Sequence, residues 1–348
     1  MGQVKIDARL VAAGYDKNRN GIVSDELKID APVDTDGNGQ VSVGELATAL
    51  GSDQVVISNG YVQARKPGQA PDMPELRIMK SIHEISGEAM TFGGPQYPAW
   101  RYQETRSRSD GSTYTYYHWR EAIADLRSKL QAIEAVAGNQ TDFRSKTIAD
   151  MARNALWQNT WSELLDDGTS RSRYAALYVA VQSINSMSKV PPQPVDSVNG
   201  MFNAVNGAKG AVDGLRNTMK DPGVVSADEK ARNKASDLRQ KAQSIPWWQY
   251  LLIFGFFKKM SLNNQAKKVE ENLSVLKAAN PDNFEFQLSE TARKAYETSQ
   301  TAWGAKNIDD AQALANSAGP IQNEASGIGS NAAGQAKKIQ DLLKTISQ

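Results

Sequence analysis

Residues 201–219 read MFNAVNGAKGAVDGLRNTM and predict one long amphipathic helix. Apolar side chains recur there at steps of 4, 3, 4, 3 and 4, the heptad spacing of helices that pack lengthwise against other helices. Comparable seams run through residues 262–276 and, with smaller side chains, through residues 321–346. The sequence therefore predicts a mainly α fold, an elongated helical bundle with heptad seams. The first seam consists of Met201, Val205, Ala208, Val212, Leu215 and Met219.

The domain organisation follows from chain length and from shifts in composition. A chain of 348 residues is long enough for roughly two to three structural units. An Asp-Gly pair between residues of high strand propensity predicts a small β-hairpin, a ribbon over residues 101–119. The expected segments are an acidic module at 1–53, a strand or hairpin with a linker at 54–74, a helical domain at 75–189, an extended Pro-rich connector at 190–197 and a helical bundle at 198–348.

Charge and cysteine content restrict the partners and the chemistry. The 40 basic and 39 acidic side chains leave a net charge of +1, so we expect no nucleic-acid partner. The absence of cysteine excludes disulfides, thiolate metal sites and a cysteine nucleophile. The first residues lack the apolar run of a signal peptide. The expected location is exported or extracellular, which would then require a non-Sec route, while a cytoplasmic location stays open.

Residues 34–45, which we call loop two, carry the strongest motif, DTDGNGQVSVGE. Oxygen-bearing side chains stand at positions 1, 3, 5, 9 and 12, the carbonyl of position 7 adds another oxygen, and Gly39 at position 6 permits a sharp turn. This spacing resembles an EF-hand loop, in which six to eight oxygens bind Ca2+. The alternative is an acidic loop held by Asx turns. The candidate ligands are Asp34, Asp36, Asn38, Gln40, Ser42 and Glu45.

Residues 16–27, which we call loop one, match the same pattern less completely and read DKNRNGIVSDEL. Position 12 is Leu27, so the loop is one residue short and either Asp25 or Glu26 must close the metal shell. The pair resembles the short paired EF-hands of bacterial proteins, over about residues 16–50. The resemblance implies calcium as the cofactor, bound more weakly by loop one. The other candidate ligands of loop one are Asp16, Asn18, Asn20 and Ile22.

Catalytic patterns are weak. His83 and His118 are the two histidines, and neither belongs to an HExxH motif or stands near a nucleophile elbow. The ribbon also carries three arginines interleaved with tyrosines, Arg101, Arg106 and Arg108. Acidic residues nearby offset their positive charge, which favours a solvent-exposed ribbon face over a surface that binds single-stranded nucleic acid. The sequence therefore predicts a protein that is not an enzyme.

Residues 245–257 form an apolar segment between polar helical arms at 226–243 and 261–279. Ten of its thirteen residues are large and apolar or aromatic. As a helix it extends about 20 Å, less than the ~30 Å hydrocarbon thickness of a bilayer, and two lysines follow it directly. These features suit the tip of a helical hairpin at a membrane interface. The residues expected at the membrane or at an interface are Trp247, Trp248, Tyr250, Leu251, Leu252, Ile253, Phe254, Phe256 and Phe257.

This layout resembles the hydrophobic tongue of helical pore-forming toxins related to haemolysin E, and also type III secretion translocators. The resemblance concerns the layout and involves no residue motif. It implies a calcium-binding, non-enzymatic subunit that is pore-forming or translocator-like and oligomeric, with membrane lipid as its partner. The alternative is a structural subunit of a filament or surface assembly, whose segment at 245–257 is buried in a core or between subunits.

Overall fold

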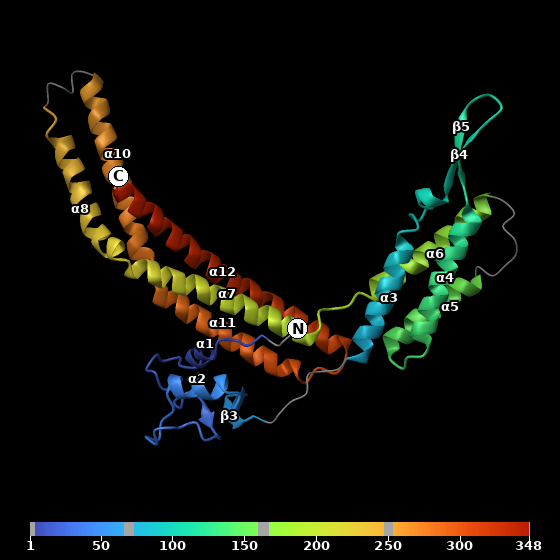
Figure 1. Ribbon diagram of the computed structural model, residues 1–348, viewed down its shortest axis with the longest axis horizontal. Helices are drawn as coiled ribbons and strands as arrows, with labels where there is room; N and C mark the ends of the chain where they lie inside the picture. The colour runs from blue at the N-terminus through green and yellow to red at the C-terminus, as the bar shows by residue number, and fades with distance from the viewer. Residues whose placement is uncertain (1–3, 66–72, 159–166, 247–252, 348) are drawn as a thin grey trace. The chain divides into compact units, whose positions relative to one another are not determined.

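The computed structural model describes residues 4–65, 73–158, 167–246 and 253–347 (Figure 1). Most of these residues are helical, which confirms the predicted mainly α fold. The chain forms two compact units. Unit one comprises Met1–Ala70, Pro194–Gly304 and Ala313–Gln348, and unit two comprises Pro71–Gln193 and Ala305–Gln312.

Unit one combines a small N-terminal module, residues 4–65, with long helices from the second half of the chain. The module contains α1 (Ala8–Ala13), β1 (Lys28–Ile29), α2 (Val43–Gly51), β2 (Val55–Ser58) and β3 (Tyr61–Ala64). The long helices are α7 (Pro194–Lys220), α8 (Pro222–Gln243), α10 (Ile253–Ala278), α11 (Pro281–Ala302) and α12 (Ile308–Ser347), and the start of α12 belongs to unit two.

Three short strands form the sheet of the N-terminal module, in the order β1-β3-β2. Strand β3 pairs antiparallel with β2 and parallel with β1. Asn59 and Gly60 connect β2 to β3 with positive φ angles of 50° and 79°, a backbone that favours Asn-Gly in tight hairpins. The strand run predicted at the start of 54–74 therefore folds as a hairpin.

The N-terminal module and the long helices share one hydrophobic core. Leu10, Val11 and Ala12 of α1 are buried in the same cluster as Leu288 and Ala292 of α11. A helix of six residues is too short to be stable by itself, so α1 depends on this packing. Residues 1–53, expected as a separate segment, therefore fold as one unit with the C-terminal helices.

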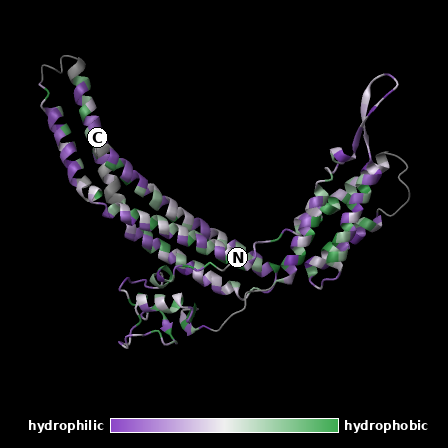
Figure 2. Cartoon of the chain, viewed as in Figure 1, coloured by the Kyte–Doolittle hydropathy of each residue, from purple (hydrophilic) through white to green (hydrophobic). Residues whose placement is uncertain are grey.

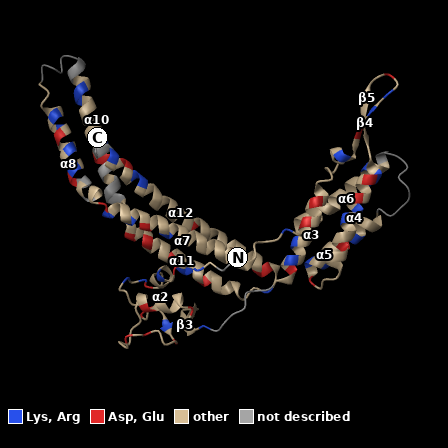
Figure 3. Cartoon of the chain, viewed as in Figure 1, with Lys and Arg blue, Asp and Glu red and all other residues tan. Residues whose placement is uncertain are grey.

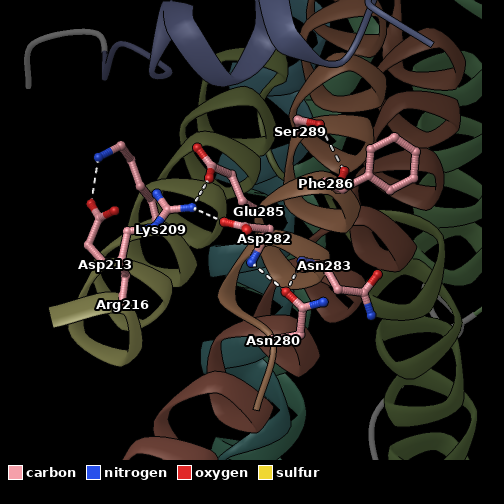
Figure 4. A network of polar contacts seen from close by, with 9 residues as sticks. All are labelled: Lys209, Asp213, Arg216, Asn280, Asp282, Asn283, Glu285, Phe286 and Ser289. Atoms are coloured by element: carbon pink, nitrogen blue, oxygen red, sulfur yellow. Dashed lines mark hydrogen bonds and ion pairs between the residues drawn. The ribbon is translucent and has the colours of Figure 1, made fainter. Parts of the chain in front are cut away.

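Helices α7, α11 and α12 approach one another closely. The residues of the first predicted seam from Met201 to Leu215 are buried. A Cβ atom at Gly329 of α12 would lie 3.0 Å from the Cα atom of Ala208 in α7, so the small side chains allow this approach. Figure 4 shows Arg216 of α7 between Asp282, 2.8 Å away, and Glu285 of α11.

Helices α8 and α10 form a hairpin with a thin apolar core. Ala231, Ala235 and Val269 make up its buried cluster, and Leu238 packs against them. Hydrophilic residues are frequent along α8, and both signs of charge alternate on it (Figures 2 and 3). An ion pair between Arg239 and Glu270 (2.7 Å) joins the two helices. The hairpin therefore buries little apolar surface along its length.

Unit two is a helical bundle with a β-ribbon. Leu126, Leu130 and Ile133 of α4 are fully buried in its core. The hydroxyl of the buried Tyr174 in α6 donates a hydrogen bond to the carbonyl of Phe92, at 3.0 Å. Its elements are α3 (Pro74–Met90), η1 (Trp100–Tyr102), β4 (Gln103–Ser107), β5 (Thr113–Tyr117), α4 (Trp119–Gly138), α5 (Phe143–Gln158) and α6 (Asp167–Met187), and β4 pairs antiparallel with β5 as predicted for 101–119.

The connection between α6 and α7 is shorter than predicted. Helix α7 begins at Pro194, so the prediction of extended chain over 190–197 is wrong from residue 194 onward. Proline has a fixed φ near the helical value and lacks an amide hydrogen, and the first turn of a helix accepts both properties. Pro194, which the sequence analysis places in an extended connector, is therefore the first residue of α7.

Candidate metal centre

Loop two leads directly into α2, and Glu45 closes the loop at the start of that helix. Ser42 is the N-cap residue, and its hydroxyl accepts a hydrogen bond from the Glu45 amide (3.2 Å). In return Glu45 Oε2 accepts from the amide and the hydroxyl of Ser42, both at 2.9 Å. Glu45 Oε1 accepts from the amide and the hydroxyl of Thr35, both at 2.8 Å. The capping box therefore holds this carboxylate across the mouth of the loop.

The two aspartates of loop two are turned inward by hydrogen bonds to the backbone. Asp34 accepts from the amides of Gly37 (2.7 Å) and Gly39 (2.8 Å), one on each oxygen. Both glycines have positive φ, 72° and 80°, which a residue with a side chain adopts rarely. Asp36 Oδ1 accepts from the amide of Asn38 at 3.1 Å. The glycine positions of the motif therefore fold the chain around the Asp34 carboxylate.

Three carboxylates converge in loop two. Oxygen atoms of Asp34, Asp36 and Glu45 all lie within 4.8 Å of one another. Oxygens 2.3–2.6 Å from one calcium ion are separated by no more than about 5 Å, so a single ion can contact all three groups. The hydrogen bonds from the Ser42 and Thr35 amides, followed by those from their hydroxyls, lower the pKa of Glu45 to about 2. Glu45 therefore stays ionised to well below neutral pH.

The donor set of loop two fits a hard cation. Every candidate ligand is an oxygen, as calcium prefers, whereas zinc is usually bound by nitrogen or sulfur. Asn38 Oδ1 accepts from the Gln40 amide (2.7 Å), and Asn38 Nδ2 donates to Asp36 Oδ2 (2.9 Å). The six residues predicted from the sequence thus lie on one loop, and three of them have carboxylate oxygens that already converge.

Loop one is less well arranged, and both candidates for its closing ligand accept hydrogen bonds from within the loop. Asp16 accepts from the amides of Asn20 (3.1 Å) and Gly21 (2.9 Å), as Asp34 does in loop two. Asp25 Oδ2 accepts from the side-chain amide of Asn20 at 2.8 Å. Glu26 Oε1 accepts from the Asn18 amide at 3.2 Å, and its Oε2 is buried with no hydrogen-bond partner within the described ranges. Each of the two carboxylates thus accepts a hydrogen bond on one oxygen, so these contacts do not decide which of them closes the loop.

Of loop one's other ligand candidates, Asn20 Oδ1 accepts from the Ile22 amide at 2.8 Å. Asn18 Oδ1 accepts from the Asn20 amide at 2.9 Å. Both amide side chains thus stabilise the turn itself. Within residues 4–65, 73–158, 167–246 and 253–347, a group of three converging acidic residues is found in loop two and not in loop one.

The two loops are joined side by side. Ile22 of loop one and Ser42 of loop two form an antiparallel bridge. The Val23 amide donates to the Val41 carbonyl at 2.8 Å, and both side chains are buried in the core of unit one. The backbone of one loop therefore supports the other, and a change in either is transmitted to the core between them.

The two histidines lie outside the metal centre. His83 Nδ1 lies 3.1 Å from the carbonyl of Asn185 and 3.3 Å from Ser188 Oγ, between α3 and α6. His118 Nε2 lies 3.2 Å from Glu104, whose side chain is exposed on the ribbon. These contacts join structural elements. The sequence-based prediction that the chain is not an enzyme stays a prediction.

The predicted membrane segment is described only at its end. Residues 247–252 lie outside the described residues, as do the side chains of Ile253 and Phe254. Phe256 and Phe257, in the first turn of α10, are 56% and 60% exposed, and Met260 is 52% exposed. No described helix is long and apolar enough to cross a membrane. The described end of the hairpin therefore presents two phenyl rings to solvent.

Comparison of the chain with protein-family models, with curated proteins and with solved structures gives no match.

The sequence analysis does not identify α11, which carries the contacts of loop one with the long helices. Tyr15 donates a hydrogen bond to Glu297 Oε1 (3.1 Å), and burial together with the Glu297 charge raises the pKa of Tyr15, so the phenol stays protonated. A helix-start signal was present in the sequence, because Asn280 followed by Pro281 is a favoured N-cap and first helical residue. The buried residues that follow are Leu288, Ser289, Thr291, Ala292, Ala295, Ser299 and Ala302.

Proposed function

We propose that this protein is a non-enzymatic calcium-binding protein whose metal centre is loop two, with loop one as a second and weaker site. The observation that supports the proposal is the convergence of Asp34, Asp36 and Glu45 within 4.8 Å on a loop whose glycines and capping box hold them there. Calcium, when bound, supplies charge neutralisation and a rigid loop. The EF-hand resemblance of the sequence points to the same ion.

The test is a calcium titration of the full-length protein by calorimetry. We expect Glu45→Gln to weaken calcium binding more than any other single substitution in loop two, because glutamate at position 12 can supply two oxygens. The matched control is Glu84→Gln, an exposed glutamate on α3 of unit two, which should bind calcium like the wild type. Absence of binding heat in the wild type at millimolar calcium would leave loop two as an acidic turn.

We further propose that the α8–α10 hairpin engages membrane as part of a pore-forming or translocator-like oligomer. The observation that favours this function is the exposure of Phe256 and Phe257 beside Lys258 at the described end of the hairpin. Phenyl rings next to lysine suit the interface between lipid tails and headgroups. The apolar composition of residues 245–257 extends the same surface in the sequence.

Flotation with liposomes tests the membrane proposal. Two phenylalanines about 60% exposed hold roughly 200 Å2 of apolar surface, which at ~25 cal/mol per Å2 contributes about 5 kcal/mol when buried in lipid. The double substitution of Phe256 and Phe257 by serine should therefore strongly reduce flotation. The matched control is Phe143→Ser, because Phe143 is 86% exposed on α5 and belongs to unit two. Equal flotation of both variants would contradict the proposal.

The alternative function is a structural subunit of a filament or surface assembly, with the apolar segment buried between subunits. The small residues along α7 and α12 favour it, since Ala211 and Gly214 lie opposite Ala333 and Ala336 on a groove open to solvent. Sedimentation without lipid separates the two functions. A stable oligomer that dissociates on substitution of Phe256 and Phe257, with no liposome binding by the wild type, would support the assembly.

We propose export by a non-Sec route as the setting for either function. Calcium affinity falls with the number of charged ligands, and the weak sites of extracellular modules have dissociation constants of about 10⁻⁴–10⁻³ M. We expect loop one to be such a weak site, because it lacks a glutamate at position 12. Detection of the protein in the culture medium of cells that lack a functional Sec pathway would test the route.

A further inference from the structure

Loop one lies against α11, and the inference that follows rests on the calcium-binding function proposed above. Gly14, at the end of α1, approaches α11 so closely that a Cβ atom would lie 2.2 Å from the carbonyl oxygen of Ser289. The next residue, Tyr15, is buried and donates to Glu297 Oε1 at 3.1 Å. Arg293 pairs with Glu297 at 2.9 Å and so fixes the acceptor. The chain therefore enters loop one from a point held on α11.

A second anchor comes from inside loop one. Arg19 stands at position 4, and its guanidinium carbon lies 3.6 Å above the centre of the Phe286 ring of α11. The φ angle of Arg19 is 60°, in the left-handed region that residues with side chains adopt rarely. Surrounding contacts are needed to keep such a backbone in place. The Phe286 ring is one of these contacts, and Figure 4 shows Phe286 on the α11 ribbon.

One of these two anchors directly precedes the first candidate calcium ligand of loop one, and the other lies between two of the ligands. Tyr15 comes directly before Asp16, and Arg19 lies between Asn18 and Asn20. Any movement of the N-terminal module away from α11 releases both anchors and therefore the positions of the three ligands.

We propose that calcium binding at loop one and docking of the N-terminal module on α11 are coupled, each strengthening the other. Docking fixes the backbone of loop one at Tyr15 and at Arg19, whose guanidinium is engaged by an aromatic ring, and a cation binds more tightly to a fixed loop than to a mobile one. Because coupling between two binding equilibria is reciprocal, calcium in loop one stabilises the docked module by the same factor. The calcium level then sets how firmly the module packs on α11, which gives loop one a conformational output in unit one.

The experiment measures calcium affinity by calorimetry in full-length proteins. A Glu45→Gln background removes the contribution of loop two, and Phe286→Ala then removes the ring that Arg19 covers. We expect Phe286→Ala to weaken loop one about fivefold, the lower end of typical allosteric couplings. Tyr15→Phe, which deletes one hydroxyl and keeps the ring, should also lower the calcium affinity of loop one. Gln287→Ala, an exposed neighbour on α11, is the control and should leave the affinity unchanged.

Hydrogen exchange provides a second readout in the same Glu45→Gln protein. Calcium should slow amide exchange in residues 284–297 of α11 and should do so less in the Phe286→Ala variant. Unchanged calcium affinity in both Phe286→Ala and Tyr15→Phe would overturn the coupling while calcium binding itself stands. Calcium binding by the wild type but not by Glu45→Gln would also overturn the coupling and leave loop two as the metal site. Absence of calcium binding in the wild type would overturn the proposed function and the coupling with it.

Discussion

Replacing Gly14 by alanine tests whether α1 packs against α11 as closely as the structure shows. Gly14 has φ −68° and ψ −14°, a right-handed helical backbone that alanine adopts without strain. Alanine therefore has a favourable effect through the unfolded chain, worth about 0.4–1 kcal/mol. Any destabilisation by Gly14→Ala must come from the space around the new methyl group.

The space at Gly14 is insufficient for a methyl group. The new Cβ atom would lie 2.2 Å from the Ser289 carbonyl oxygen and 2.8 Å from the Cβ atom of Arg293, and both neighbours belong to α11. One is a backbone atom and the other is the first side-chain carbon, so neither can rotate away and α1 must shift as a whole. Overpacking of this kind typically costs ~1–3 kcal/mol. After subtraction of the backbone gain, we expect Gly14→Ala to lower the free energy of unfolding by about 1–2 kcal/mol.

The assay is urea denaturation of the full-length protein, followed by far-ultraviolet circular dichroism, with Gly327→Ala as the matched control. Gly327 lies in α12, and apart from its chain neighbours and the backbone of its own helix, a Cβ atom there would meet no atom within 4 Å. Alanine in an open helical position stabilises by roughly 0.5–1 kcal/mol relative to glycine. The two glycine-to-alanine changes should therefore move the midpoint in opposite directions. A shift in the same direction for both would refute the close approach of α1 to α11.

Three further predictions concern the core, a turn and the acid range. Leu126→Ala should destabilise unit two by about 2–5 kcal/mol in thermal or urea denaturation, because Leu126 is fully buried in α4. Gly60→Ala should cost about 1 kcal/mol in the same assay, because its φ of 79° lies in a region unfavourable to alanine. Glu45 has a folded-state pKa of about 2 against an ordinary value of 4.5, so the stability it contributes is complete above about pH 4.5 and is lost as the pH falls toward 2. Glu45→Gln should flatten that part of the pH–stability curve measured without calcium, and an unchanged curve would contradict the assigned hydrogen bonds.

The spacing of apolar residues predicts the long helices because helix formation depends on local periodicity. The pattern that begins at Met201 lies in α7. The glycine and aspartate positions of loop two likewise determine a local backbone, so its inward-facing carboxylates follow from the motif. The long helices and the turn of loop two depend on residues that are close in the sequence, so the sequence could predict them.

The features that sequence reasoning missed depend on contacts between distant residues. Nothing near Gly14 in the chain indicates that Ser289 will lie against it, and the ring under Arg19 comes from residue 286. The hydrogen bonds from Asn20 to Asp25 and from Asn18 to Glu26 in loop one also depend on the three-dimensional geometry of the loop. The residues that join the N-terminal module to α11 are thus visible only in the folded chain.

The most direct test of the metal centre is the anomalous X-ray signal of crystals grown with millimolar calcium. We predict a peak in loop two, with oxygens of Asp34, Asp36 and Glu45 at 2.3–2.6 Å from the ion. The same peak should vanish in crystals of Glu45→Gln or fall strongly in occupancy. A map of the wild type at saturating calcium with no peak among these three carboxylates would contradict the account.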